Sequence, residues 1–184
     1  MRLGALLLRS LIGALFVGHG TQKLFGWFGG PGLEGVGGMM ESLEMRPARR
    51  HAMLASGAET LGGTLLLAGA ATPLATTMLT STMVTAVRKV HWTKGVWNTG
   101  GGYEYNLVLV GALTALAENG PGPLSVDGDR LHGTGWALAS LGCGVAGSFL
   151  ATSPPLNAPA SEPEPAARTG RFERAEQPVE ATTT

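Results

Sequence analysis

Five long runs of apolar residues restrict this chain more than any other feature of its sequence. They cover residues 3–28, 51–71, 74–90, 103–117 and 132–151. The second and fifth runs are the strongest candidates for membrane-spanning helices. A helix needs about 20 mostly apolar residues to cross a bilayer, and all five runs reach or approach that length. None shows the strict alternation of a transmembrane barrel strand. The pattern predicts an all-α protein that crosses a membrane several times.

Two other interpretations of these runs explain less. The helices of a soluble bundle need polar outer faces, but only 14% of the residues are charged, against about 25% in soluble domains. A cleaved signal peptide would need small residues at a cleavage site after the first run, and "VGHGTQKLFGW" does not supply them. We therefore expect the first run to remain as a membrane helix.

The connections between the runs fit helices that lie side by side. Residues 69–73, "GAATP", allow only a tight hairpin, and Pro73 suits the first turn of the next helix. The segment 29–50 is glycine-rich and partly amphipathic, which favours the membrane surface, whereas 118–130 is a turn-rich loop. Residues 153–184 are rich in Pro, Ala, Glu and Thr and hold too little apolar surface to fold, so we predict a disordered tail.

The positions of lysine and arginine predict the orientation in the cell membrane. One end of the helices carries Arg2 and Arg130. The opposite end carries most of the other basic residues: Arg46, Arg49, Arg50, Arg88, Lys89 and Lys94, with Arg168, Arg171 and Arg174 of the tail. Because basic ends stay in the cytoplasm, we expect the N-terminus outside and the C-terminus inside. Acids and bases balance over the chain, so its net charge predicts no nucleic-acid partner.

Glu59 is the residue least compatible with a plain apolar helix. It lies about 12 Å into the second run, too deep for its short side chain to reach the headgroups. A carboxylate at this depth must be paired, hydrogen-bonded, hydrated or protonated. Glu59 therefore either forms a buried ion pair that fixes helix packing or belongs to a site that transfers protons or binds a ligand.

The alternating direction of the helices brings the polar residues of the first four runs to the basic end. We expect these residues to form one polar pocket: His19, Lys23, Glu59, Arg88, His91, Glu104 and Asn106. Two of them also have structural interpretations, because the helix dipole favours Glu104 near a helix start and Asn106 can bond between helices. Arg9 lies near the opposite membrane face, where we expect its side chain to reach the headgroups.

The segment 91–106, "HWTKGVWNTGGGYEYN", joins the third and fourth helices at the basic end. Its three consecutive glycines allow a tight reversal of the backbone, and its aromatic residues suit an interfacial belt. We expect this segment to close over the polar pocket as a lid.

The sequence contains no Walker loop, no CxxC and no HExxH. Its single cysteine, Cys143, permits no internal disulfide and no cysteine metal cage. The histidines have no local metal-binding spacing, so a haem or metal would need a distant pair such as His19 and His91, and we predict no metal site.

The last run has small residues, Ser140, Gly144 and Ser148, at four-residue steps. Such a face allows close contact between helices. It suits either a homo-oligomer or docking on the chain's own bundle.

Three stretches together resemble the DoxX family of bacterial membrane proteins: "LLLRSLIGALFVGHGTQKLFGWFGGPG", "AETLGGTLLLAGAATPLA" and "GGGYEYNLVLVGALTALAENGPGPLSVD". They cover about residues 6–127. The resemblance implies a four-helix transmembrane core, residues 1–127, that serves as an oxidoreductase component; the family takes its name from a subunit of an archaeal quinol oxidase. By position it implies these family residues: His19, Gly20, Lys23, Glu59, Gly63, His91, Gly101, Glu104, Asn106, Gly120, Gly122, Ser125 and Asp127. This chain adds a transmembrane helix within 128–152 and the tail 153–184.

Two hypotheses of function follow. In the first, the protein is a membrane redox component whose pocket binds a quinone-like molecule, while a soluble oxidoreductase supplies the electrons. His19 or His91 bonds the ring oxygens, and Glu59 handles a proton with Lys23 or Arg88 as its charge partner. In the second, the protein is a non-enzymatic membrane scaffold or a small-molecule transporter, and the polar cluster holds the helices together or lines a permeation path.

Overall fold

The computed structural model describes residues 3–154 and 156–157, and every regular element in this part of the chain is helical. Six α-helices follow one another: α1 (Leu3–Phe25), α2 (Gly32–Ser42), α3 (Ala48–Ala68), α4 (Thr72–Ala86), α5 (Glu104–Asn119) and α6 (Thr134–Ala151). Four shorter helical segments lie between them: Trp27–Gly29, Val87–His91, Trp92–Lys94 and Asn98–Gly100. The five long helices match the five apolar runs, which confirms the predicted all-α fold.

Two of the described helices, α1 and α6, are long and apolar enough to cross a membrane. We predicted that the second and fifth runs would be the strongest candidates, and this is wrong for the second. The corresponding helix, α3, starts with Arg49, Arg50 and His51 and contains several glycine, serine and threonine residues. These polar and small residues lower its hydropathy, whereas α1 has two charged residues in 23.

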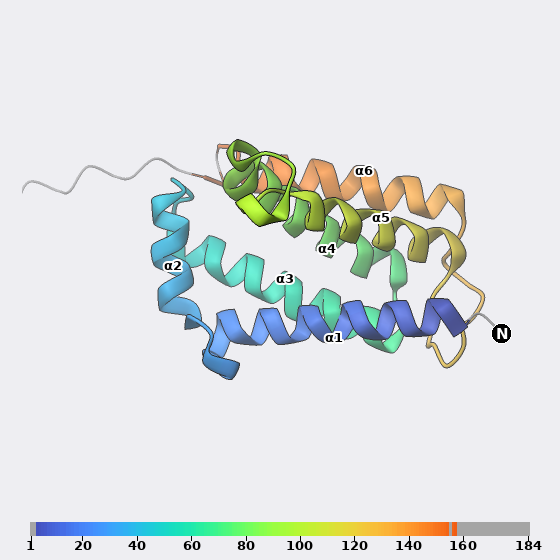
Figure 1. Cartoon of the computed structure of the whole chain (residues 1–184). Coiled ribbons are helices and arrows are strands. Elements are labelled where there is room, and N and C mark those ends of the chain that lie inside the picture. Colours follow the sequence, from blue (N-terminus) through green and yellow to red (C-terminus); the bar gives the residue numbers. More distant parts are fainter. Residues whose placement is uncertain (1–2, 155, 158–184) are drawn as a thin grey trace, which may run out of the picture.

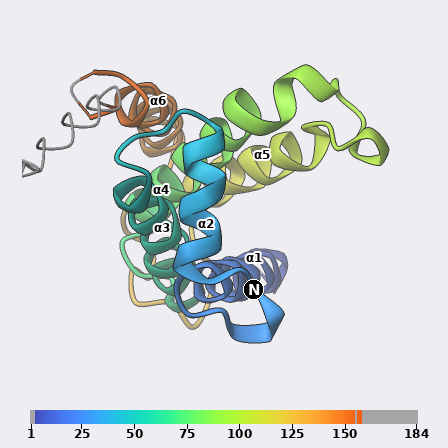
Figure 2. The same ribbon diagram turned by 90° about the vertical axis from the view of Figure 1, so that its left-hand side faces the viewer.

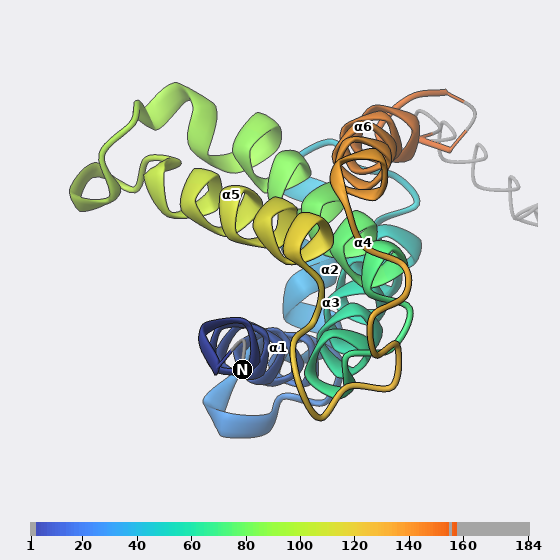
Figure 3. The ribbon, with the colours of Figure 1, turned by 90° about the vertical axis from the view of Figure 1, so that its right-hand side faces the viewer.

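The five long helices run along one common direction, and α2 crosses one of their ends (Figure 1). α4 lies in the middle and packs on α3, α5 and α6, while α1 packs mainly on α3. Seen from either end, α1 and α5 extend in different directions from the α3–α4 pair (Figures 2 and 3).

The apolar core lies where α1, α3, α4 and α5 meet. It is built mainly from these buried side chains: Ile12, Phe16, Leu66, Leu79, Leu113 and Leu116. A second buried cluster, Val36, Met40, Met45 and Ala52, attaches α2 to the start of α3. α2 is thus the partly amphipathic element expected in the long connection after the first run.

α1 and α3 touch backbone to backbone through glycines. A Cβ atom built on Gly63 would lie 2.8 Å from the Gly13 carbonyl oxygen and 2.8 Å from the Val17 nitrogen. A Cβ on Gly13 would lie equally close to the Gly63 carbonyl oxygen. Neither backbone can move without separating the helices, so both positions require glycine.

Gly63→Ala is therefore expected to lower the free energy of unfolding by about 1–3 kcal/mol, because the added methyl overpacks the α1–α3 contact. Gly57→Ala on the same helix is the matched control, because its Cβ meets nothing within 4 Å. The control removes a helix-interior glycine and should stabilise α3 by up to about 1 kcal/mol. Thermal unfolding in one detergent compares the two, and equal midpoints would contradict this account of the contact.

The small-residue face of α6 docks on α4 of the same chain. Ser140 Oγ donates a hydrogen bond to the Pro73 carbonyl at 3.1 Å, and Thr85 Oγ1 donates one to Ser148 Oγ at 2.9 Å. A Cβ on Gly144 would lie 2.7 Å from the side chain of Thr80. We predicted that this face serves either a homo-oligomer or docking on the chain's own bundle, and in the structure it docks on the bundle.

Most of the predicted disordered tail, residues 153–184, lies outside the described residues. The described beginning of this segment folds back on the end that α2 crosses. The Asn157 side chain accepts a hydrogen bond from the Arg46 backbone N–H at 2.6 Å and donates one to the Glu44 carbonyl at 3.1 Å. The division of the chain at residues 127 and 152 stays a prediction.

Candidate functional site

Glu59, on the buried face of α3, is the centre of the candidate site. Its side chain is almost completely buried, with 3% of the residue exposed. Its Oε1 atom accepts a hydrogen bond from Lys23 Nζ at 2.6 Å. Lys23 reaches it because the last turn of α1 lies against the middle of α3, and a positive charge there also complements the C-terminal end of the α1 dipole. Of the two charge partners predicted for Glu59, Lys23 is therefore the one in contact.

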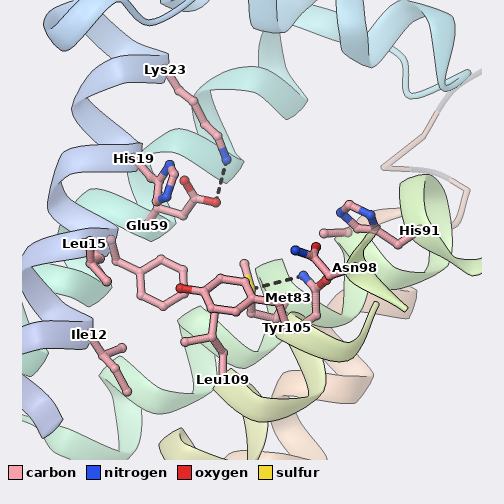
Figure 4. Close-up of a pocket in the computed structure, with 13 residues that line it drawn as sticks. Ile12, Leu15, His19, Lys23, Glu59, Met83, His91, Asn98, Tyr105 and Leu109 are labelled. Atoms are coloured by element: carbon pink, nitrogen blue, oxygen red, sulfur yellow. Dashed lines mark hydrogen bonds and ion pairs between the residues drawn. The ribbon is translucent and has the colours of Figure 1, made fainter. Parts of the chain in front are cut away.

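The other carboxylate oxygen of Glu59, Oε2, is buried and has no hydrogen-bond partner in the described part of the chain. Buried polar atoms are nearly always hydrogen-bonded, because leaving one unpaired costs about 1–3 kcal/mol. The imidazole of His19, one turn before Lys23 on α1, lies beside this carboxylate (Figure 4). Oε2 thus keeps a hydrogen-bonding capacity that no described group uses, in a residue that lines the neighbouring cavity.

A cavity of about 230 Å³ lies next to Glu59, between α1, α3, α4, α5 and the segments that join α4 to α5 (Figure 4). These residues line it: Ile12, Leu15, Phe16, His19, Lys23, Glu59, Met83, Ala86, His91, Asn98, Tyr105, Asn106 and Leu109. In the close-up, the region around Ile12 and Leu109 is apolar, whereas the region between Lys23 and His91 is polar. The cavity therefore has a polar end and an apolar end.

The wall opposite Glu59 is formed by His91 and Asn106. His91 ends a π-helix that continues α4, and such segments often occur at functional sites. Its Nδ1 lies 2.7 Å from the carbonyl oxygen of Gly101, which can only accept, so Nδ1 carries a proton and Nε2 remains for other interactions. Gly101 has φ of 79°, a conformation that favours glycine. The Asn106 amide donates a hydrogen bond to Met83 Sδ at 3.4 Å.

The first half of the chain matches a known protein family. Residues 4–92, from α1 to the π-helix, match the DoxX family model. The protein belongs to the DoxX family. No curated protein and no solved structure matches the chain. The DoxX match, together with the two apolar helices α1 and α6, makes this a helical membrane protein.

The matched DoxX region carries most of the polar wall of the cavity. Five of the seven residues predicted for the pocket line this one space: His19, Lys23, Glu59, His91 and Asn106. They come from four elements, α1, α3, the π-helix and α5. The up-and-down order of the helices along the chain brings them together at one cavity.

Arg88 lies outside the cavity. Its Nη1 donates hydrogen bonds to the Ser148 carbonyl and Oγ, both at 3.0 Å, and to Thr152 Oγ1 at 3.2 Å. Its guanidinium also lies 3.6 Å from the ring centre of Phe149. All three residues belong to α6 or directly follow it. Arg88 therefore attaches α6 to the DoxX core, and its predicted place in the pocket is wrong.

Glu104 also lies outside the cavity. Its Oε1 accepts a hydrogen bond from the Asn98 backbone N–H at 2.8 Å, and its own N–H donates to the Val96 carbonyl at 2.8 Å. Glu104 opens α5, so its charge complements the helix dipole there. Its position in the first turn of α5 is the one that the structural interpretation gave it; it also bonds the loop before α5, and it does not line the cavity.

The stretch "GPGPLSVD", which follows the residues matched to DoxX, lies at the opposite end of the bundle and pairs with Arg9. Arg9 is 2% exposed, and its guanidinium donates to the carbonyls of Pro123 at 3.1 Å, Leu124 at 2.7 Å and Leu67 of α3. The prediction that Arg9 reaches the headgroups is wrong. The carbonyls that bind it have no signature in the sequence.

Asp127 ends the same stretch and binds the start of α4. Its carboxylate accepts hydrogen bonds from the backbone N–H groups of Ala71 at 2.8 Å and Thr72 at 2.7 Å, and from the Thr72 hydroxyl at 2.7 Å. This loop thus holds α1, α3 and α4 together at the end opposite the cavity.

Sequence reasoning missed several lining residues, among them Asn98 and Tyr105. Both belong to the segment 91–106, which was expected to cover the pocket as a lid. In the structure this segment forms one wall, and its tryptophans turn outward: Trp92 is 63% exposed and Trp97 is 71% exposed.

The cavity offers hydrogen-bonding groups and a charge pair at one end and an apolar surface at the other. Among the described residues no group of three or more His, Cys, Asp and Glu side chains is placed to hold a metal ion. His19 and His91 lie on opposite walls (Figure 4). The arrangement suits a small organic molecule with a polar ring or head.

Proposed function

We propose that this DoxX protein is a membrane redox component whose polar cavity binds the head group of a quinone-like molecule. The observation that carries the proposal is Glu59. Only 3% of Glu59 is exposed. One of its carboxylate oxygens accepts a hydrogen bond from Lys23, and the other has no partner among the described residues. Glu59 lines a cavity that His19 and His91 also line. Intramembrane ionisable residues of this kind commonly handle protons or ligands.

His91 has the chemistry to follow the redox state of such a ring. The Nδ1–H group of His91 donates to the Gly101 carbonyl. When the imidazole is protonated, its Nε2–H group is a second donor, which can bond a quinone oxygen. Reduction to the quinol takes up two electrons and two protons. As the ring oxygen takes the Nε2 proton, neutral His91 becomes the acceptor of the new hydroxyl group. Glu59 and His19, on the other wall, are placed to relay the second proton.

The electrons come from a soluble oxidoreductase in this proposal, because the chain contains no recognisable flavin or metal motif. The basic residues at the end crossed by α2 place that end in the cytoplasm by the positive-inside rule, with the N-terminus outside. The cavity lies near this end, so a cytoplasmic partner approaches it from the nearer side.

Titration of the detergent-purified protein with a benzoquinone that carries no side chain tests the proposal. We expect Glu59→Gln to weaken binding about tenfold or more, because hydrogen bonds to a charged group contribute about 1.5–3 kcal/mol. Glu118→Gln, on an exposed residue at the other end of α5, is the matched control and should bind as the wild type does. Absence of binding to the wild-type protein, or equal affinity in both variants, would overturn the proposal.

A further inference from the structure

A second cavity, of about 390 Å³, lies on the other side of Glu59. It is bounded by α3, α4 and α6, and α2 and the residues after it close one end. Figure 2 shows α2 in front of the ends of α3 and α4, with α6 on the far side of α4. The wall of this second cavity is predominantly apolar.

The two cavities meet at three residues, Lys23, Glu59 and Ala86, which line both of them. The ion pair thus stands between a polar space and an apolar space. Ala86, at the end of α4, adds only a methyl group at this junction. The second cavity therefore adjoins the site built around Glu59, and the Lys23–Glu59 pair forms part of the wall between the two spaces.

Four of the seven methionines of the chain line the second cavity. Met39 and Met40 of α2, with Met45 after it, line the end nearest α2, and Met78 lines the cavity from the middle of α4. Methionine side chains are unbranched and polarizable, so they adapt to flexible apolar ligands. Met40 and Met45 also pack in the buried cluster that attaches α2 to the start of α3.

We propose that the second cavity binds the hydrocarbon chain of the same molecule whose head group occupies the polar cavity. This inference rests on the proposed function and defines its ligand as an amphiphile with a ring or head and a long apolar chain. The volumes support this division. The polar cavity alone, about 230 Å³, is smaller than the about 300–1,000 Å³ of typical ligand pockets. Together, the polar cavity and the adjoining apolar cavity have a volume within that range.

The charge pair at the junction orients such a molecule. The hydrocarbon chain gains by leaving water and polar groups for the methionine-lined space. The head cannot follow without losing the hydrogen-bonding groups around Glu59 and His91. The two halves of the site thus favour one orientation of an amphiphile.

The test compares a benzoquinone without a side chain with the same ring carrying a decyl chain. Both are titrated into the full-length protein in one detergent, and the affinity of the decyl compound is corrected for its partition into micelles. We expect the chain to raise the affinity about tenfold or more, because burial of about two methylene groups already corresponds to this gain.

Filling the second cavity should remove this gain selectively. Cys143→Trp adds bulk from α6, where the cysteine lines the cavity and its side chain is exposed. Ala55→Leu fills the same space from α3 and serves if the first variant does not fold. We expect the gain to fall below about threefold while the chain-free ring binds as before. Leu138→Trp, at an exposed position of α6 outside the cavity, is the control and should keep the gain.

Three outcomes would contradict the inference, and they differ in what they mean for the proposed function. If the chain-free ring binds but the chain adds nothing, or if both filling variants keep the gain, the inference is overturned and the proposed function stands. If native mass spectrometry finds a retained phospholipid that Cys143→Trp removes, while the decyl gain is absent, the second cavity holds a separate lipid instead. If neither benzoquinone binds, both the inference and the proposed function fail.

Discussion

Arg9→Leu is expected to destabilise the protein more than any other single change discussed here, by more than about 4 kcal/mol. The guanidinium is buried and donates hydrogen bonds to carbonyls of α3 and of the loop before α6. The Leu67 carbonyl lies in the last turn of α3, where the helix itself supplies no donor. Removing Arg9 leaves this carbonyl and those of Pro123 and Leu124 without their charged donor.

Asp127 extends the effect of Arg9 to α4. The loop that Arg9 fixes also places the Asp127 carboxylate on the N–H groups at the start of α4, where the helix dipole favours a negative charge. Loss of Arg9 should therefore loosen α1, the α3–α4 hairpin and the loop that leads to α6 at the same time.

Two further variants separate this role from a simple loss of charge. Arg9→Lys keeps the charge but has no planar fork for several carbonyls, so we expect an intermediate loss of stability. Arg50→Leu, at an exposed position near the start of α3, removes an arginine without buried partners and should change the unfolding midpoint little. Thermal unfolding in detergent measures all three, and equal midpoints for Arg9→Leu and Arg50→Leu would refute the role of Arg9.

The contrast between Arg9 and Glu59 shows what the sequence could reveal about this fold. Apolar runs and short hairpins determine which helix ends meet, so the convergence of His19, Lys23, Glu59, His91 and Asn106 was predictable. The partners of Arg9 were not, because three of its acceptors are backbone carbonyls of a loop or helix end, which any residue can present.

Arg88 was misplaced for a related reason. We predicted the fifth run as an addition beyond the core, with docking on the chain's own bundle as one of two uses of its small-residue face, and we assigned Arg88 to the pocket. In the structure α6 packs along α4, and its Ser148 and Phe149 bind the Arg88 side chain. The partners of Arg88 depend on which helices pack beside α4. The hydropathy pattern does not indicate which helices lie side by side.

Lys23→Met is expected to lower the free energy of unfolding by about 3–5 kcal/mol, because it leaves the buried carboxylate of Glu59 without a counter-charge. Glu59→Gln should cost less. The Lys23 side chain is 27% exposed and lies in the last turn of α1, so its ammonium can turn toward water or headgroups. Lys94→Met, at an exposed position of the segment after the π-helix, is the control for loss of a lysine and should have little effect.

The double variant Lys23→Met/Glu59→Gln distinguishes a packing device from a ligand site. Removing both charges should recover most of the stability lost in Lys23→Met, because a neutral pair carries no desolvation penalty. If the polar cluster serves only to hold α1 against α3, this stable double variant should still bind the chain-free benzoquinone as tightly as the wild type does. We expect instead that binding stays at least about tenfold weaker although the fold is restored, because the ligand has lost the carboxylate oxygen that no other described group satisfies.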